Sequence, residues 1–527
     1  MYPIVSENSR YCVREEYFVM SDNIGLYTRT VIPKGKDKYP IIFIRDPYVP
    51  NHSGIPYDIE KCDTAGGFNI FLEHGYAVVY QHCRGAGVSE GICIPYSKRE
   101  RNDGLETLEL IRKLPVYNGE IYLYGGSYLA SVHLLYLETN PKDIKAAALH
   151  VQSDRMWYFA YRNGCRRIPS YEWWLKRAIR KYPHQNYGDE LIRPYKDVAR
   201  RVTGGDVPEY TPVLMNDEYN DYWKNDPRTN VMEELDVPIL LTEGWFDFYN
   251  YGMFSMWERL KPETKKKSFF AVGPWGHASS VTPDAGYDMP NGNLPEDFWV
   301  EWFDSKRFDR PFKYGELGKM KYYNVGSDSW KISEWPKSGS KKKIYFNSDN
   351  KLTPEPHTGN AEITYQYDPD EKQEFFKFDN IYKAPAPNTQ SDVISFTSDE
   401  FTSDESFFGN VRFRMNVSSD CEDTAFFMRL YLVENGQSYN LTDDITSLSH
   451  IDGNYTPGEI ICIDMSTPPI AFTVKKGASL RVDIASSCKR YIPHANVKGH
   501  WAEVTTTKIA HNTLLLKDSY IELQYED

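Results

Sequence analysis

The sequence lacks the cysteine spacing of a structural metal site or a redox pair. Its eight cysteines stand at positions 12, 62, 83, 93, 165, 421, 462 and 488, and none forms a Cys-x-x-Cys pair. Structural zinc and dithiol chemistry require cysteines at short spacing. We therefore expect no bound metal and no organic cofactor, and we expect reduced thiols in the cytoplasm.

Long apolar runs and an N-terminal targeting pattern are also missing. No stretch approaches the roughly 18 consecutive apolar residues that suggest a membrane-spanning helix. A signal peptide needs an apolar centre, and residues 1–21 carry Glu7, Arg10, Arg14 and Glu15 instead. We expect a cytoplasmic protein with no membrane partner.

Positive charge is in deficit. The formal net charge is -13 at pH 7, which disfavours nucleic acid or an anionic membrane as a partner. Residues 162–201 are locally basic, and a solvated helix face explains them more simply than a phosphate or nucleic-acid site. The chain has 527 residues, too many for one core, so two or three domains are expected.

Residues 23–145 carry the pattern of alternating strands and helices. Apolar runs occupy 39–44 and 76–80, and apolar residues recur at helical spacing within 103–114, where Asp103 fits the start of a capping box. Continuous apolar strands that alternate with helices indicate a parallel sheet covered on both faces.

A serine lies at a sharp strand-to-helix junction. The apolar run 121–123 is followed by the segment 124–130, YGGSYLA, and then by a helical stretch at 131–137. A Gly-lined turn of this kind pushes the hydroxyl of Ser127 out of the backbone at the carboxyl edge of a sheet. The alternative interpretation is a small residue in an ordinary turn.

Two further motifs follow in the order that such a serine needs. Asp247 ends a GWFD segment and His277 ends a GPWGH segment, each just after an apolar strand. Serine, aspartate and histidine in this chain order are typical of an α/β-hydrolase triad. The rival base His82 precedes the serine, and the rival nucleophile Cys83 has no recognisable elbow.

An acyl-transfer intermediate also needs hydrogen-bond donors for its oxyanion. The backbone N–H of Tyr128, directly after the serine, is the first candidate. The hydroxyl of Tyr48, in a loop after an early strand, is a candidate for the second. From these residues alone, a turn tyrosine beside Pro47 is the simpler interpretation.

The rest of the chain has two other patterns. After residue 154 the strand signals fade and short amphipathic helices rich in Trp, Tyr, Arg and Lys follow, as in an inserted cap. After about residue 315 apolar and polar residues alternate in short runs between turns, as in a sandwich or jelly roll. We predict an α/β-hydrolase catalytic domain at 1–154 and 236–314, a helical cap at 155–235 and a β jelly-roll domain at 315–527.

The order of short motifs resembles the bacterial cocaine esterase and X-Pro dipeptidyl-peptidase family, which includes the α-amino-acid ester hydrolases and CocE/NonD-type serine hydrolases. Segments that match the family pattern lie at 45–48, 84–91, 125–129, 244–247, 273–277, 455–459 and 480–481. The resemblance implies Ser127, Asp247 and His277 as the triad. It also implies Tyr48 and the Tyr128 amide as oxyanion donors.

The chain departs from the family pattern at three places. Ala130 replaces the last glycine of the serine elbow, and His82 replaces an aspartate. The segment 384–387 lacks a Gly-Gly pair that the family often has, so that edge of the substrate pocket is expected to differ.

The residues after Asp247 bear on the substrate. A free α-ammonium in an apolar pocket needs compensating carboxylates, and the resemblance places them closely after the triad aspartate in α-amino-acid ester hydrolases. Residues 248–250 are Phe, Tyr and Asn. This favours a carboxylesterase, although Asp154 or Glu172 from the cap could supply the charge for an X-Pro dipeptidyl-peptidase.

An aromatic acyl pocket suits such an esterase. The candidates to line it are Trp157, Tyr158, Trp173, Trp174 and Tyr249. The alternative is that the cap tryptophans form the cap's own core. The expected partner is a small-molecule ester, with peptide or amide cleavage and a homodimer both left open. A carbohydrate-binding protein with a silent hydrolase domain is the alternative from another class.

Overall fold

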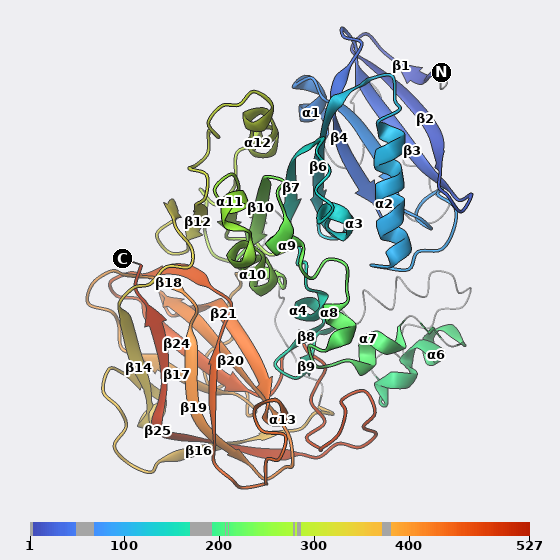
Figure 1. The fold of residues 1–527 in the computed structure, drawn as a ribbon. Coiled ribbons are helices and arrows are strands. Elements are labelled where there is room, and N and C mark those ends of the chain that lie inside the picture. The colour runs from blue at the N-terminus through green and yellow to red at the C-terminus, as the bar shows by residue number, and fades with distance from the viewer. Residues whose placement is uncertain are drawn as a thin grey trace.

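The computed structural model describes residues 4–48, 68–168, 192–205, 207–208, 210–277, 280–281, 286–371 and 381–526. Figure 1 shows two parts built on β-sheets, with a group of short helices beside them. Among the described residues, no helix combines the length and the apolar character needed to cross a membrane.

The first part is an 11-stranded sheet. In spatial order its strands are β1 (Ile4–Glu7), β2 (Tyr11–Val19), β3 (Gly25–Pro33), β5 (Ala77–His82), β4 (Tyr39–Asp46), β6 (Tyr117–Gly126), β7 (Ile144–His150), β10 (Ile239–Gly244), β11 (Phe269–Gly273), β12 (Met320–Asn324) and β13 (Ser329–Ser333). The strands from β5 to β12 in this order run parallel to their neighbours. The two edges are antiparallel.

Helices cover both faces of this sheet, as the sequence predicts. Ile41 and Phe43 belong to a core that includes residues of α2, α3 and α10, whereas Ile42 and Ile44 pack in a core with α1 and α12. A strand buried on both faces is therefore apolar at every position. The helices are α1 (Asn69–Glu73), α2 (Lys98–Ile111), α3 (Tyr128–Leu137), α10 (Asn250–Arg259), α11 (Pro262–Lys265) and α12 (Phe298–Arg307).

Helix α2 begins earlier than the apolar pattern predicts. Its N-cap is Ser97, whose hydroxyl accepts the N–H of Glu100 at 3.2 Å. Asp103 lies inside the helix, and its carboxylate accepts from Arg84 at 2.7 and 2.9 Å. The predicted capping box at Asp103 is therefore wrong, because the charged first turn hides the true start of the helix.

The first sheet also continues beyond residue 315, where the β domain was predicted to begin. Strand β12 pairs parallel with β11, and β13 returns antiparallel to close that edge. Their alternating residues look like those of the later β strands, so periodicity alone could not assign them to the first sheet.

Short elements lie between Ser127 and Asp247, and most of them share one apolar cluster, whereas Val231 and Met232 of the last one pack in the core of the first sheet. The elements are α4 (Met156–Ala160), β8 (Tyr161–Arg162), β9 (Cys165–Arg166), the 3-10 turn η3 (Tyr195–Asp197), α6 (Val198–Thr203), α7 (Thr211–Met215), α8 (Asp221–Lys224) and α9 (Val231–Glu234). Tyr195, Trp223 and neighbouring apolar side chains form the apolar cluster. We call the elements from α4 to α8 the cap segment.

The third part consists almost entirely of β-strands. Nine of them form one sheet path in the order β21 (Gln437–Ser447), β20 (Ala425–Glu434), β24 (Ser479–Ala485), β17 (Ile394–Ser398), β15 (Lys351–Thr353), β14 (Lys341–Asn347), β25 (Ala510–Gln524), β19 (Arg412–Ser419) and β22 (Ile461–Ser466). The remaining elements are β16 (Glu362–Tyr367), which pairs with β25, the pair β18 (Glu405–Gly409) and β23 (Ile470–Val474), the turn η4 (Ser348–Asn350) and α13 (Leu448–Ile451). We call this the β part.

Backbone hydrogen bonds fasten the cap segment to the β part. The N–H of Ile492 donates to the carbonyl of Arg166 at 2.9 Å, and the N–H of Ile168 donates to the carbonyl of Arg490 at 2.8 Å. Figure 1 shows the hairpin β8–β9 next to the β part. Such bonds hold a segment in place more firmly than side-chain contacts on a surface.

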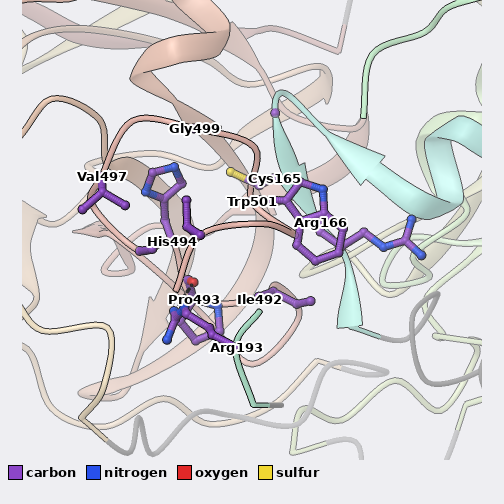
Figure 2. Close-up of a pocket in the computed structure, with 12 residues that line it drawn as sticks. Cys165, Arg166, Arg193, Ile492, Pro493, His494, Val497, Gly499 and Trp501 are labelled. Atoms are coloured by element: carbon purple, nitrogen blue, oxygen red, sulfur yellow. Dashed lines mark hydrogen bonds between the residues drawn. The ribbon is translucent and has the colours of Figure 1, made fainter. Parts of the chain in front are cut away.

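A buried ion pair and a small cavity lie along the same seam. Nε of Arg162 donates to Oδ1 of Asp444 at 2.7 Å, and both side chains are almost inaccessible to solvent. Figure 2 shows the side chains around the cavity, among them Cys165, Pro493 and Trp501. Its volume of about 20 Å³ has room for roughly one water, so the seam is packed like a protein interior.

Candidate functional site

Four polar side chains meet at the carboxyl edge of the parallel strands. Tyr48 lies just after β4, Ser127 follows β6, Asp247 lies beyond β10 and His277 lies beyond β11. Because these strands are parallel, their carboxyl ends share one edge of the sheet. Loops far apart in the sequence therefore come together there.

Ser127 occupies a strained turn between β6 and α3. Its φ of 54° and ψ of -126° lie in a region that non-glycine residues rarely adopt. Its N–H donates to the carbonyl of His150 at 2.9 Å, which ties the turn to β7. A Cβ on Gly125 would lie 2.5 Å from the carbonyl of Leu129, whereas a Cβ on Gly126 would meet only His150, at 3.8 Å.

The two glycines make a matched pair for a mutational test. We expect Gly125→Ala to push α3 away from β6, to lower the melting temperature and to reduce kcat/KM about 10²-fold, as misplacement of a reacting group by about 1 Å does. Gly126→Ala should leave both quantities nearly unchanged. Thermal melts and hydrolase assays of the two variants check this, and equal effects would contradict it.

Ser127, His277 and Asp247 form a continuous chain of hydrogen bonds. Nε2 of His277 lies 2.8 Å from Oγ of Ser127, and Nδ1 lies 2.7 Å from Oδ2 of Asp247. Oδ1 of Asp247 accepts the N–H of Tyr249 at 2.7 Å. A carboxylate beside Nδ1 favours the tautomer that carries its proton there, which leaves Nε2 free to accept from the serine.

The loops that carry Asp247 and His277 are locked to each other. The N–H of Trp245 donates to the carbonyl of Gly273 at 2.9 Å, and the N–H of Phe246 donates to the carbonyl of Trp275 at 3.1 Å. A Cβ on Gly244 would lie 2.1 Å from that Trp275 carbonyl. The glycine of the GWFD segment therefore permits this close approach.

Tyr48 and the Tyr128 amide converge on the serine. The hydroxyl of Tyr48 donates to Oγ of Ser127 at 2.8 Å, and it accepts the N–H of Tyr128 at 3.0 Å. The two predicted oxyanion donors are thus hydrogen-bonded neighbours next to the candidate nucleophile. A substrate carbonyl oxygen within about 3 Å of both donor atoms could accept from both in place of their present acceptors.

A buried carboxyl supports this pair from behind. The hydroxyl of Tyr128 lies 2.9 Å from both oxygens of Glu100, and Oε2 of Glu100 also accepts the N–H of Tyr96 at 2.9 Å. Burial raises the pKa of Glu100, and the nearby Arg45 opposes that shift. Sequence analysis missed Glu100, because a glutamate in the charged first turn of a helix has no distinctive pattern.

Aromatic side chains cover the imidazole. The ring of Phe248 stacks on His277 with centroids 4.5 Å apart, and Tyr249 lies 5.7 Å from the same ring. Phe159 of α4 packs against both of these aromatics. Of the predicted pocket residues, Tyr249 therefore lies beside the site, and Phe248 and Phe159 were missed. The sequence signal that could have identified them is their position: Phe248 directly follows Asp247, and Phe159 lies two residues after Trp157.

Two other predicted pocket residues, Trp157 and Tyr158, belong to α4, and Trp157 packs against the same apolar cluster as Phe248 and Tyr249. Trp157 and Tyr158 contact each other at 5.6 Å, and Tyr158 packs against Tyr251 at 4.9 Å. Trp157 also packs against Tyr219 at 5.8 Å, so these aromatics contact both the cap segment and α10, and their place in an acyl pocket stays a prediction. Trp173 and Trp174 lie outside the described residues.

The two rivals for nucleophile and base are both buried, and Cys83 lies in the small apolar cluster that includes Tyr128. The ring of His82 packs 4.7 Å from that of Tyr27, and burial lowers the pKa of His82 to about 4. Burial also raises the pKa of the Cys83 thiol well above its usual range, so it stays protonated and unreactive. The imidazole that contacts Ser127 is that of His277, not that of His82.

The chain matches two family models in sequence order. Residues 22–279 match X-Pro dipeptidyl-peptidase (S15 family), and residues 313–521 match the X-Pro dipeptidyl-peptidase C-terminal non-catalytic domain. The chain is similar to cocaine esterase from Rhodococcus sp. (strain MB1 Bresler), at 23% identity over 93% of this chain and 94% of that protein.

Solved structures give the same fold over nearly the whole length. An α-amino acid ester hydrolase matches with a TM-score of 0.84 at 19% identity, over 99% of this chain and 98% of that one. An aminopeptidase from a marine sediment Thaumarchaeota archaeon matches with a TM-score of 0.83 at 19% identity, over 98% and 96% of the two chains. A catalytic domain is thus followed by a C-terminal non-catalytic domain. The chain is a hydrolase and belongs to the S15 family of X-Pro dipeptidyl-peptidases and CocE/NonD-type hydrolases.

Proposed function

We propose that this hydrolase is a carboxylesterase that uses Ser127 as nucleophile, His277 as base and Asp247 as the partner of that base. The observation that carries the proposal is the unbroken chain of hydrogen bonds from Asp247 through His277 to Ser127. A serine hydroxyl is a weak nucleophile at neutral pH and needs such a base within hydrogen-bond reach.

The proposed reaction has two acyl-transfer steps. His277 takes the proton of Ser127 as Oγ attacks the ester carbonyl carbon, and it then gives that proton to the leaving alcohol. The acyl-enzyme is hydrolysed by water in the same manner, with His277 again as base. Asp247 stabilises the imidazolium that forms in each step.

The Tyr48 hydroxyl and the Tyr128 amide are proposed to hold the negative charge that develops on the carbonyl oxygen. Before substrate arrives, the Tyr48 hydroxyl already lies 2.8 Å from Oγ of Ser127 and 3.0 Å from the Tyr128 nitrogen. Donors fixed in advance need no reorganisation as charge forms, which is the main source of their catalytic effect.

The surroundings favour an uncharged, apolar or aromatic acyl group. The residues that follow Asp247 include Phe248 and Tyr249, which cover the imidazole. Asp154 is fully buried, and both its oxygens accept from Nη2 of Arg259 at 2.6 and 2.7 Å. Asp154 is therefore committed to an arginine, which argues against its binding a substrate ammonium. Glu172 lies outside the described residues.

The same proposal includes the finer features of the fold and the setting. The order of β4, β6, β7, β10 and β11 supports an α/β-hydrolase with an inserted helical cap, and the long strand paths of the β part support a jelly roll. The described cysteines are free thiols, which supports a cytoplasmic location. A small-molecule ester is the proposed partner.

A panel of p-nitrophenyl esters tests the substrate class. We expect aromatic and aliphatic acyl esters to exceed α-amino acyl esters by at least about tenfold in kcat/KM, which corresponds to about 1.4 kcal/mol. An unpaired ammonium next to Phe248 and Tyr249 explains the difference. A preference for α-amino acyl esters, or for X-Pro p-nitroanilides, would overturn the esterase assignment in favour of the peptidase.

A fluorophosphonate probe tests the enzyme itself. The natural protein should be labelled once per chain and Ser127→Ala should not be labelled. Glycan binding without any labelling would instead favour a carbohydrate-binding protein with a silent hydrolase domain.

A further inference from the structure

A second carboxyl lies beside Asp247 and has no role in the mechanism above. Glu243 is the last residue but one of β10, four residues before Asp247, and its side chain is fully buried. Its Oε1 accepts the N–H of Gly244 at 2.7 Å. Its Oε2 has no hydrogen-bond donor in the described part of the chain.

The neighbours of Glu243 leave it without a cation. Among the described residues the charged group that acts on it is Asp247, whose carboxyl is within hydrogen-bonding reach. The nearest titratable ring in β7 is His150, opposite Thr242, and burial lowers its pKa to about 3, so it stays neutral. In β11 all the residues, from Phe269 to Gly273, are uncharged.

Two carboxylates that touch cannot bond to each other unless one carries a proton. Asp247 already receives two N–H donors, from His277 and Tyr249, whereas Glu243 receives one. Glu243 is the carboxyl with fewer donors to stabilise an anion, so the shared proton belongs on Glu243. Burial, and then the charge of Asp247, raises the pKa of Glu243 well above its usual range.

We propose that Glu243 is a neutral carboxylic acid that donates a hydrogen bond to Asp247 and so acts as a positioning residue for it. The proton also gives the orphaned Oε2 a partner. The inference rests on the proposed function of Asp247. A third hydrogen bond fixes the rotamer in which Oδ2 faces His277, and the pair carries one negative charge opposite the one positive charge that His277 gains.

The test compares Glu243→Gln with Glu243→Leu by kcat, KM and the pH profile of kcat/KM. Gln keeps a donor and the same net charge, so we expect activity within about threefold of the natural enzyme and an unchanged acid limb. Leu removes the donor, so kcat should fall about 10- to 100-fold, as for other supporting hydrogen bonds, with KM unchanged. Rescue by Gln distinguishes positioning from packing.

The opposite outcomes are equally definite. If Glu243 were charged, Glu243→Gln would remove a negative charge near His277 and lower the midpoint of the acid limb by about one unit, which would overturn the proposal. Equal kcat for the Leu variant and the natural enzyme would also overturn it.

An infrared measurement keeps the proton testable even if Glu243→Leu does not fold. The natural protein should show at neutral pH a carbonyl stretch of a protonated carboxylic acid that disappears in Glu243→Gln, whereas any band from another buried carboxyl, such as Glu100, should persist in both. Absence of that band would overturn the proposal. If the natural protein shows the band but no ester hydrolysis and no fluorophosphonate labelling, the proposed function fails while the protonated Glu243 stands.

Discussion

Replacing Ser127 by alanine is expected to lower kcat for a p-nitrophenyl ester by about 10⁶-fold, as loss of the nucleophile does in serine hydrolases. KM should change little, because the groups that would bind the acyl part remain. Nε2 of His277 is hydrogen-bonded to Oγ of Ser127, so removing Oγ leaves His277 without a nucleophile to deprotonate. Burst kinetics and fluorophosphonate labelling measure the loss directly.

The control for this variant is Ser305→Ala. The hydroxyl of Ser305 bonds the carbonyl of Trp302 within α12, on a different element from the site. It should keep full activity and full labelling. Labelling of Ser127→Ala at the natural rate would show that another residue is the nucleophile.

Tyr48→Phe is expected to lower kcat by about 10²- to 10³-fold, the usual cost of removing one oxyanion donor. Only the hydroxyl is lost, and that hydroxyl donates to Ser127 and accepts from the Tyr128 amide. KM should stay within about threefold, because the hydrogen bond strengthens only as negative charge forms. Labelling by the fluorophosphonate should be slower but still reach one per chain.

The matched control is Tyr124→Phe. Tyr124 lies three residues before Ser127 in β6, and its ring packs against Phe71 and His150. Loss of its hydroxyl should leave kcat within about twofold of the natural enzyme. If the two phenylalanine variants behave alike, Tyr48 has no part in stabilising the oxyanion.

The residues of the candidate triad could be predicted from the sequence because each of them follows a short apolar strand. Ser127, Asp247 and His277 could be picked out in this way. Tyr48 was a candidate from its loop, and the family resemblance, which the two family models confirm, favoured it over a simple turn tyrosine. Contacts made by elements from elsewhere in the chain could not be read. The stack of Phe248 on His277 needs two loops at once, and no local pattern encodes that.

Some polar residues of the β part are buried where the alternation of the sequence does not indicate burial. Arg481 and Asp483 alternate with apolar residues in β24, which is typical of a strand with one face in water. In the structure both are buried and paired with each other at 2.7 Å, and Arg481 also donates to the carbonyl of Pro385. A segment that covers a polar face is invisible to periodicity, as are buried carboxyls such as Glu100 and Glu243.

The contacts between the cap segment and the β part can form only late in the protein's synthesis. Arg162 pairs with the buried Asp444, which lies 282 residues further along the chain. The carbonyl of Arg166 accepts the N–H of Ile492. Because a ribosome delivers the amino-terminal residues first, the strands of the first sheet are made before the residues that anchor the cap segment to the β part. A cap segment moved to another protein would therefore need the partners Asp444 and Ile492 moved with it.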